Sequence, residues 1–230
     1  MKTIGILGGM SWESSALYYT IINEAVNARL GGQHNARSVM VTVDFDEIEK
    51  LQHLGRWDEA ANILRESSEA LERAGADMIV IATNTMHKLL PQIREGITIP
   101  FLHIAQATAD AIKARGLQRI GLLGTRFTME EDFYKQILID NGIEVVIPNK
   151  EERDLIHGVI YNELCLGTVR DASKNAYLEI IAHMEDDEKI EGVILGCTEI
   201  GMLISQDDLA LPVLDTTRIH ALAAVEEVLS

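Results

Sequence analysis

Two patterns of apolar and polar positions alternate along the chain. Short, almost entirely apolar runs bounded by glycine or polar residues are typical of strands buried on both faces of a parallel sheet. Between them, apolar residues recur every three or four positions, which is typical of helices. The predicted strands are residues 3–7, 39–43, 78–82, 100–102, 120–123, 144–147, 193–195 and 211–214. The predicted helices cover residues 11 to 31, 57–74, a segment ending near 116, 128 to 141, 151–164, 171–184 and 216–229. This alternation predicts an α/β fold.

The strand pattern also repeats within the chain. Residues 4–8 align with 120–124, residues 81–85 with 195–199, and residues 99–102 with 211–214, in the same order and with slowly drifting offsets. The repeat predicts two similar halves, each with about four parallel strands. The alternative is that βα units share apolar strands and glycine turns without a duplication.

Composition and charge narrow the class of protein. The 230 residues are enough for one large or two small domains. Twenty Lys and Arg stand against 36 Asp and Glu, a net charge of −16, which argues against nucleic acid or an anionic membrane as a partner. No apolar run approaches the roughly 20 residues of a membrane helix, and glycine interrupts the N-terminal segment too early for a secretory signal. Two cysteines provide no disulfide framework, so a cytoplasmic setting is expected.

No sequence motif calls for a metal or a cofactor. CxxC and HExxH spacings are absent, and the glycine turn after the first strand lacks the GxGxxG pattern of a dinucleotide site. The strongest candidate chemistry lies in residues 191–199, EGVILGCTE, where Cys197 follows an apolar strand. Ligands of α/β sheets bind at the carboxyl ends of the strands, although a free cysteine is also often simply packed in a core. The repeat places Thr83 opposite Cys197. Two acid/base groups on opposite sides of a ligand suit the inversion of a stereocentre.

Four motifs together resemble the aspartate/glutamate racemase family, whose members invert amino acids without pyridoxal phosphate. They are GILGGMSWES at 5–14, TNTMHK at 83–88, LLGTRFTM at 122–129 and GCTEIG at 196–201. The resemblance implies two pseudo-symmetric α/β domains, here residues 1–102 with 215–230 and residues 103–214. It further implies an active site in the cleft between them, an amino-acid substrate, no cofactor and a homodimer.

By the same resemblance, Cys197 is one acid/base, and Thr83 stands where the family usually has a second cysteine. The implied substrate-binding residues are Met10, Gln52, Asn84, Thr85, Thr125, Thr128, Thr198 and Glu199.

Alternative interpretations remain for four of the residues in these segments. Thr128 also suits a helix N-cap. Gln52 competes with Lys50, His53 and Arg56 for the distal carboxylate. His87 is either a partner of the cysteine or a residue of a surface helix, and Cys165, where family members can carry a lysine, is expected to be packed.

The expected function is therefore a cofactor-independent racemase of aspartate, glutamate or both. Because a threonine hydroxyl is a far weaker acid and base than a thiol, the reaction is expected to be lopsided. The direction L to D is expected because L-amino acids are the abundant pool. One alternative is a single-cysteine decarboxylase of the arylmalonate type, against which the low aromatic content of 5% argues. The other is a non-catalytic amino-acid-binding protein.

Overall fold

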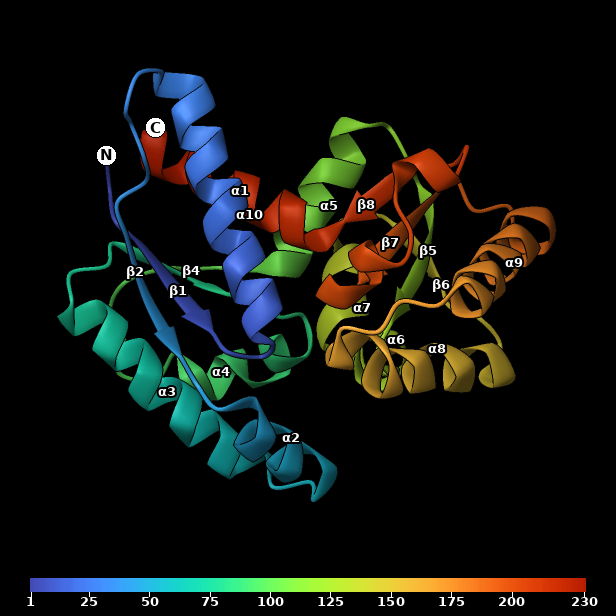
Figure 1. The fold of residues 1–230 in the computed structure, drawn as a ribbon, viewed down its shortest axis with the longest axis horizontal. Helices are drawn as coiled ribbons and strands as arrows, with labels where there is room; N and C mark the ends of the chain where they lie inside the picture. The colour runs from blue at the N-terminus through green and yellow to red at the C-terminus, as the bar shows by residue number, and fades with distance from the viewer. The chain divides into compact units, whose positions relative to one another are not determined.

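The chain divides into two compact units, each described here by itself. The computed structural model describes residues 1–230 (Figure 1). Unit 1 comprises Met1–Ile104 and Thr217–Ser230, and unit 2 comprises Ala105–Thr216. The chain therefore passes from one unit to the other twice, after Ile104 and after Thr216. Each unit contains one four-stranded, fully parallel sheet.

The sheet of unit 1 has the strand order β2-β1-β3-β4. Its strands are β1 (Ile4–Gly8), β2 (Ser38–Thr42), β3 (Met78–Ile81) and β4 (Phe101–Leu102). Its helices are α1 (Trp12–Leu30), α2 (Phe45–His53), α3 (Trp57–Arg73), the 3-10 helix η1 (Thr85–Leu89), α4 (Leu90–Ile93) and α10 (Thr216–Leu229). Helix α1 begins where the Ser11 side chain accepts a hydrogen bond from the Ser14 N–H, a standard N-cap.

Helices cover both faces of this sheet because its central strands are apolar on both sides. Ile4, Ile6 and Val80 pack against α1 and α10, while Leu7 and Ile81 pack against α2 and α3. In Figure 1, α1 and α10 accordingly lie on one side of the strands and α3 on the other. Continuous apolar strands are what a sheet covered on both faces requires.

The sheet of unit 2 has the equivalent order β6-β5-β7-β8. Its strands are β5 (Arg119–Gly124), β6 (Glu144–Val146), β7 (Gly192–Gly196) and β8 (Val213–Asp215). Its helices are α5 (Ile104–Ala114), α6 (Arg126–Glu130), α7 (Asp132–Asp140), α8 (Lys150–Asn162), η2 (Leu164–Leu166), α9 (Asp171–Glu188), η3 (Thr198–Met202) and η4 (Gln206–Asp208). One core cluster joins β5 and β7 to α8, α9 and η3.

Strand order and register agree between the two units. Leu7 of β1 is the partner of Ile81 of β3, and Leu123 of β5 is the partner of Leu195 of β7. These are the pairs that the sequence repeat aligns, so the prediction of two similar four-stranded halves is confirmed.

One helix was not predicted, and one local prediction was wrong. The segment after β2, which was not assigned a structure, forms α2, capped by the Asp44 side chain. The single helix expected from residue 128 to 141 is two helices, because Glu131 adopts an extended conformation between α6 and α7.

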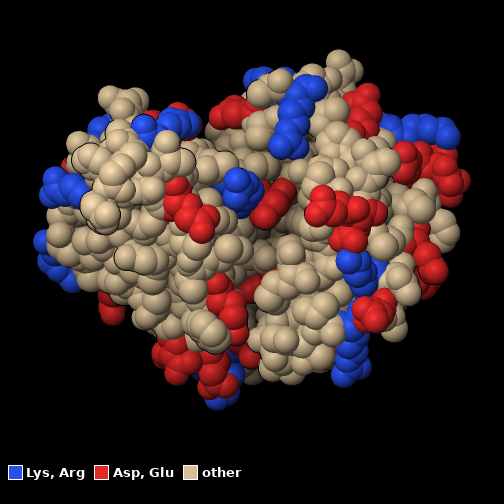
Figure 2. Space-filling view, turned by 45° about the horizontal axis from the view of Figure 1, so that its top comes forward, with Lys and Arg blue, Asp and Glu red and all other residues tan.

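Charged side chains of both signs are interspersed on the face drawn in Figure 2, with uncharged areas between them. Charge spread in this way is typical of a solvated surface. None of the helices combines the length with the apolar character that crossing a membrane requires.

Candidate functional site

In unit 1, the turn after β1 depends on Gly9. Gly9 has a φ of +94°, and a Cβ there would lie 2.2 Å from the carbonyl oxygen of Val43, so only glycine fits. Its N–H donates to the Ser15 hydroxyl over 2.8 Å, which ties the turn to α1. Met10, which follows, is buried in the cluster beneath the turn.

The turn after β3 carries Thr83, Asn84 and Thr85. Asn84 and Thr85 are buried, whereas Thr83 is half-buried. The Thr83 backbone makes two hydrogen bonds, from its N–H to the Ile81 carbonyl and from the His87 ring to its own carbonyl, each 2.8 Å long. Since β1 and β3 are adjacent parallel strands, both turns lie at the carboxyl edge of the same sheet.

His87 is not a residue of a surface helix, as one interpretation of the sequence had it. Its side chain is only 2% exposed. Burial, together with the nearby His103 and His220, holds the pKa of His87 well below its ordinary value, so the ring is neutral.

Gln52 lies on α2 and is 4% exposed, whereas Lys50, His53 and Arg56 are exposed. Lys50 forms an ion pair with Asp46, and Arg56 with Glu59. Of the four competing side chains, Gln52 alone is enclosed by unit 1.

In unit 2, Cys197 directly follows β7 and is the N-cap residue of η3. Its thiol donates to the Glu199 carboxylate with an Sγ to Oε2 distance of 2.9 Å, and the Thr198 hydroxyl donates to the same oxygen over 2.8 Å. All three side chains are buried. Cys197 is thus both packed, at 9% exposure, and hydrogen-bonded to an acid/base group, so the two interpretations of its position are compatible.

The environment of Cys197 favours the thiol over the thiolate. Burial raises the pKa of Cys197 well above its ordinary value, and the negative charge of Glu199 raises it further, because both disfavour a second anion. At rest, Cys197 is therefore a proton donor facing a carboxylate.

The turn after β5 brings Thr125 and Thr128 together. Thr125 caps α6 by accepting from the Thr128 N–H over 3.3 Å, and the two hydroxyls lie 3.2 Å apart. The N-cap interpretation of Thr128 was therefore wrong, since Thr125 is the cap. Gly124 and Gly196 pair at the ends of β5 and β7, and a Cβ on either would come within 3.2 Å of the Thr128 side chain.

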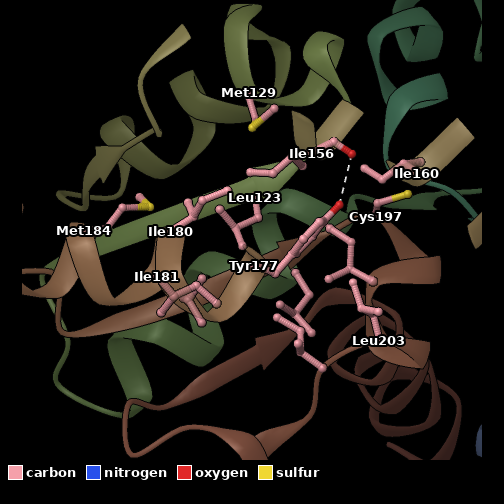
Figure 3. Close-up of a cluster of buried hydrophobic side chains, with 14 of the residues drawn as sticks. Leu123, Met129, Ile156, Ile160, Tyr177, Ile180, Ile181, Met184, Cys197 and Leu203 are labelled. Atoms are coloured by element: carbon pink, nitrogen blue, oxygen red, sulfur yellow. Dashed lines mark hydrogen bonds between the residues drawn. The ribbon is translucent and has the colours of Figure 1, made fainter. Parts of the chain in front are cut away.

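Tyr177 is buried in the same core cluster as Cys197 (Figure 3). Its hydroxyl donates to the Ile156 carbonyl over 3.0 Å, drawn as a dashed line in Figure 3. Burial raises the pKa of Tyr177, so it stays neutral. Cys165 is half-buried and packs on the same cluster, as predicted.

Each unit thus gathers its predicted site residues at the carboxyl edge of its own sheet. In unit 1 these are the turn residues Met10, Thr83, Asn84 and Thr85, with Gln52 on the neighbouring α2. In unit 2 they are Thr125, Thr128, Cys197, Thr198 and Glu199. No group of three or more His, Cys, Asp or Glu side chains is arranged to hold a metal ion.

Sequence reasoning missed the residues that support these turns. Ser15 holds Gly9, and the Thr216 hydroxyl donates to the Leu195 carbonyl near the end of β7 over 2.8 Å. His220 is buried among the apolar residues of α10 and bonds to the Leu102 carbonyl over 2.9 Å. A polar residue at an apolar helix position was the one available signal for His220.

Comparison with known proteins identifies the relatives of this chain. The family model for Asp/Glu/hydantoin racemases matches residues 7–224. A crystal structure of a candidate Asp/Glu racemase from Yersinia pestis is 47% identical, with a TM-score of 0.93 and full coverage of both chains. The crystal structure of an aspartate racemase homologue from Pyrococcus horikoshii OT3 is 35% identical, with a TM-score of 0.87 and full coverage of both.

A curated relative, the broad specificity amino-acid racemase of Bacillus subtilis (strain 168), is 22% identical over 176 residues, which are 75% of this chain and 74% of that protein. Other curated relatives are named glutamate racemases, and the chain spans only about half of their length (52% and 49%). The relatives and structural neighbours are thus amino-acid racemases by name.

Proposed function

The chain belongs to the Asp/Glu/hydantoin racemase family, and from that membership we propose that it is a cofactor-independent racemase of aspartate, glutamate or both. The proposal includes a preference for conversion of L to D, a homodimer and a cytoplasmic setting. It also assigns proton transfer at the two opposite faces of Cα to Thr83 and Cys197.

The observation that carries the proposal is the hydrogen bond from Cys197 to Glu199 at the carboxyl end of β7. A cysteine that takes the proton from Cα must first give up its own, and Glu199 lies where it accepts that proton. The sulfur then takes the Cα proton and becomes a thiol again. The Thr83 hydroxyl, directly or through a water, returns a proton to the other face, and solvent restores the threonine and Glu199.

The binding residues have suitable chemistry for an acidic amino acid. Hydroxyls and an amide from Thr85, Thr125 and Asn84 can donate to carboxylates, and Glu199 can accept from an ammonium group. Turn amides at the strand ends add further donors for anions.

Hydrogen exchange at Cα tests the proposal directly. The protein is incubated with L- or D-aspartate and L- or D-glutamate in heavy water, and loss of the Cα proton is followed by NMR. We expect faster exchange from the L-enantiomers, and a loss of about 10²–10⁴-fold with Cys197→Ser. Equal exchange into both enantiomers would contradict the lopsided reaction, and binding without exchange would indicate an amino-acid-binding protein.

Thr83→Cys tests the second acid/base. Because a thiol is a much stronger acid and base than a hydroxyl, this variant should raise exchange from the D-enantiomers. Cys165→Ser is the matched control, because it exchanges a thiol and a hydroxyl at a position outside the predicted site. It should leave the ratio of D to L exchange unchanged. If Thr83→Cys behaves like the control, Thr83 is not the second acid/base.

One observation favours a second candidate function. A cysteine held as a thiol is the form that gives a proton to a carbanion, which is what a single-cysteine decarboxylase needs. Release of carbon dioxide from aryl-substituted malonates, without exchange of amino acids, would identify that activity.

A further inference from the structure

The ring of His87 joins two segments of unit 1 that are distant in the sequence. Its Nδ1 lies 2.8 Å from the carbonyl oxygen of Thr83, in the turn after β3. Its Nε2 lies 3.3 Å from the backbone nitrogen of Ile104, the last residue of unit 1 before the chain passes into unit 2. Both ring nitrogens are therefore used inside the protein.

These two partners assign the tautomer of His87. The Ile104 N–H can only donate, so Nε2 accepts and carries no proton. The proton of the neutral ring is then on Nδ1, where the Thr83 carbonyl can only accept it. The two bonds require each other, because a ring protonated on Nε2 would lose both.

Neighbouring rings restrain His87 in this state. The His103 ring is centred 4.6 Å away and the His220 ring 5.8 Å away. His220 is itself fixed, since it donates from Nε2 to the Leu102 carbonyl and accepts at Nδ1 from the Tyr18 hydroxyl over 2.7 Å. A buried set of neutral rings thus lies under the Thr83 turn.

From these contacts we propose that His87 is a positioning residue of the reaction, which holds the Thr83 turn through its Nδ1–H bond to the Thr83 carbonyl. The inference rests on the proposed function, in which Thr83 returns the proton. His87 does not touch the substrate in this role. It fixes the backbone from which the hydroxyl of Thr83 projects, and a displacement of about 1 Å at a reacting group can cost about 100-fold in rate.

Two substitutions separate the two hydrogen bonds of the ring. In His87→Asn, the side-chain amide occupies the place of Nδ1 and can still donate to the Thr83 carbonyl, while the bond to Ile104 is lost. In His87→Gln, the amide reaches the place of Nε2 and can still accept from the Ile104 N–H, while the bond to Thr83 is lost. Each variant gives up one hydrogen bond, so a general loss of stability is similar in both.

The readout is the number of inversions per exchange of the Cα proton of L-substrate in heavy water. Exchange with retention needs only Cys197, whereas inversion also needs Thr83. We expect His87→Gln to lower inversions per exchange about 10-fold or more, and His87→Asn to stay within about 3-fold of the wild type. Tyr18→Phe, which removes a bond of the same ring cluster away from Thr83, should lower the melting temperature and leave the ratio unchanged.

The outcomes distinguish this inference from the proposed function. A wild type without any exchange refutes the proposed function, and with it the role of His87 in that reaction. A wild type that exchanges and inverts, with equal ratios in His87→Gln and His87→Asn, refutes the positioning role. If neither variant folds, nitrogen NMR shifts of histidine in the wild type decide, because a proton on Nε2 of His87 would overturn the inference.

Discussion

The turns that follow β3 and β7 occupy equivalent positions in two sheets of the same strand order, yet different chemistry lies behind each. Behind Thr83 lies His87, a neutral ring that bonds to the backbone of the turn. Behind Cys197 lies Glu199, a carboxylate that accepts the proton of the reactive group itself. In the proposed reaction, the contact in unit 1 holds the Thr83 turn in position, and the contact in unit 2 takes part in a proton transfer.

If the proposed reaction holds, two halves with the same fold carry out different proton-transfer steps. A thiol beside a carboxylate can exchange its proton within the site, whereas a hydroxyl on a turn held by a histidine depends on water or substrate for its proton. The proposed preference for L to D thus has a counterpart in the residues that contact each turn, beyond the identity of Thr83.

Removing the Cys197 thiol should produce the largest effect, a loss of Cα exchange. Cys197→Ser leaves a hydroxyl at both predicted acid/base positions, and we expect Cα exchange to fall by about 10²–10⁴-fold. Exchange is measured by NMR in heavy water with L-aspartate and L-glutamate. Cys165→Ser, in the same core cluster, should retain activity. Comparable losses in both variants would show that packing, rather than proton transfer, is what Cys197 provides.

As the pH falls, unit 1 should lose stability before unit 2 does. Burial lowers the pKa of both His103 and His220 to about 4, whereas the unfolded chain takes up these protons near pH 6.5. Stability from the neutral rings is therefore fully present above pH 6.5 and falls as the pH falls towards 4. For the fully buried His220, the loss is about 1.4 kcal/mol per pH unit in that window.

Amide exchange at pH 7 and pH 5, corrected for intrinsic rates, checks this expectation. The amides of β1 and β3 should lose protection relative to those of β5 and β7. The buried tyrosines of unit 2, Tyr134 and Tyr177, have raised pKa values and do not titrate in this range. Equal losses in the two sheets would contradict the prediction.

Neutralising Glu199 should make Cys197, in the turn after β7, easier to deprotonate. In Glu199→Gln the amide keeps the size of the side chain but removes the negative charge that disfavours a thiolate. The pKa of Cys197 should therefore fall, although burial keeps it above its ordinary value. The pH profile of alkylation by iodoacetamide should shift to lower pH, with Cys165→Ser as background so that only one thiol reacts. An unchanged profile would mean that the carboxylate does not govern the thiol.

The smallest expected effect concerns a glycine with no role in either turn. Gly158 lies inside α8, and a Cβ there would meet only the Asn162 side chain at 3.8 Å. Gly158→Ala should stabilise unit 2 by about 0.5–1 kcal/mol without changing exchange, measured by denaturant unfolding. A change in activity would show that the flexibility of α8 contributes to the site.

The sequence predicted the sheets well because their signals are local. The apolar run ending at Leu195 and the glycine and cysteine after it lie within a few residues of each other. The missed helix α2 also carried a local signal, with Ile48 and Leu51 three residues apart behind the cap at Asp44. Its nine residues were too few for the period to stand out.

The supporting contacts of the site could not be predicted in the same way. His87 gains its buried state from Ile104, His103 and His220, which reach it only through the fold. Similarly, Gln52 could be chosen over Lys50 only once α2 had an inner and an outer face. Local patterns predict elements, whereas the burial of a polar group depends on which distant elements meet.

The return of the chain to unit 1 after Thr216 has a consequence for synthesis. One core cluster of unit 1 needs Ala221, Ala224, Val225 and Val228 of α10, whereas the core of unit 2 uses none of them. While a ribosome is still adding residues 217–230, unit 2 already has all of its strands, and unit 1 still exposes the apolar side of α1 and β1. The half of the protein that begins first is therefore the last to be completed, and a nascent chain stalled shortly before α10 would present that apolar surface to chaperones.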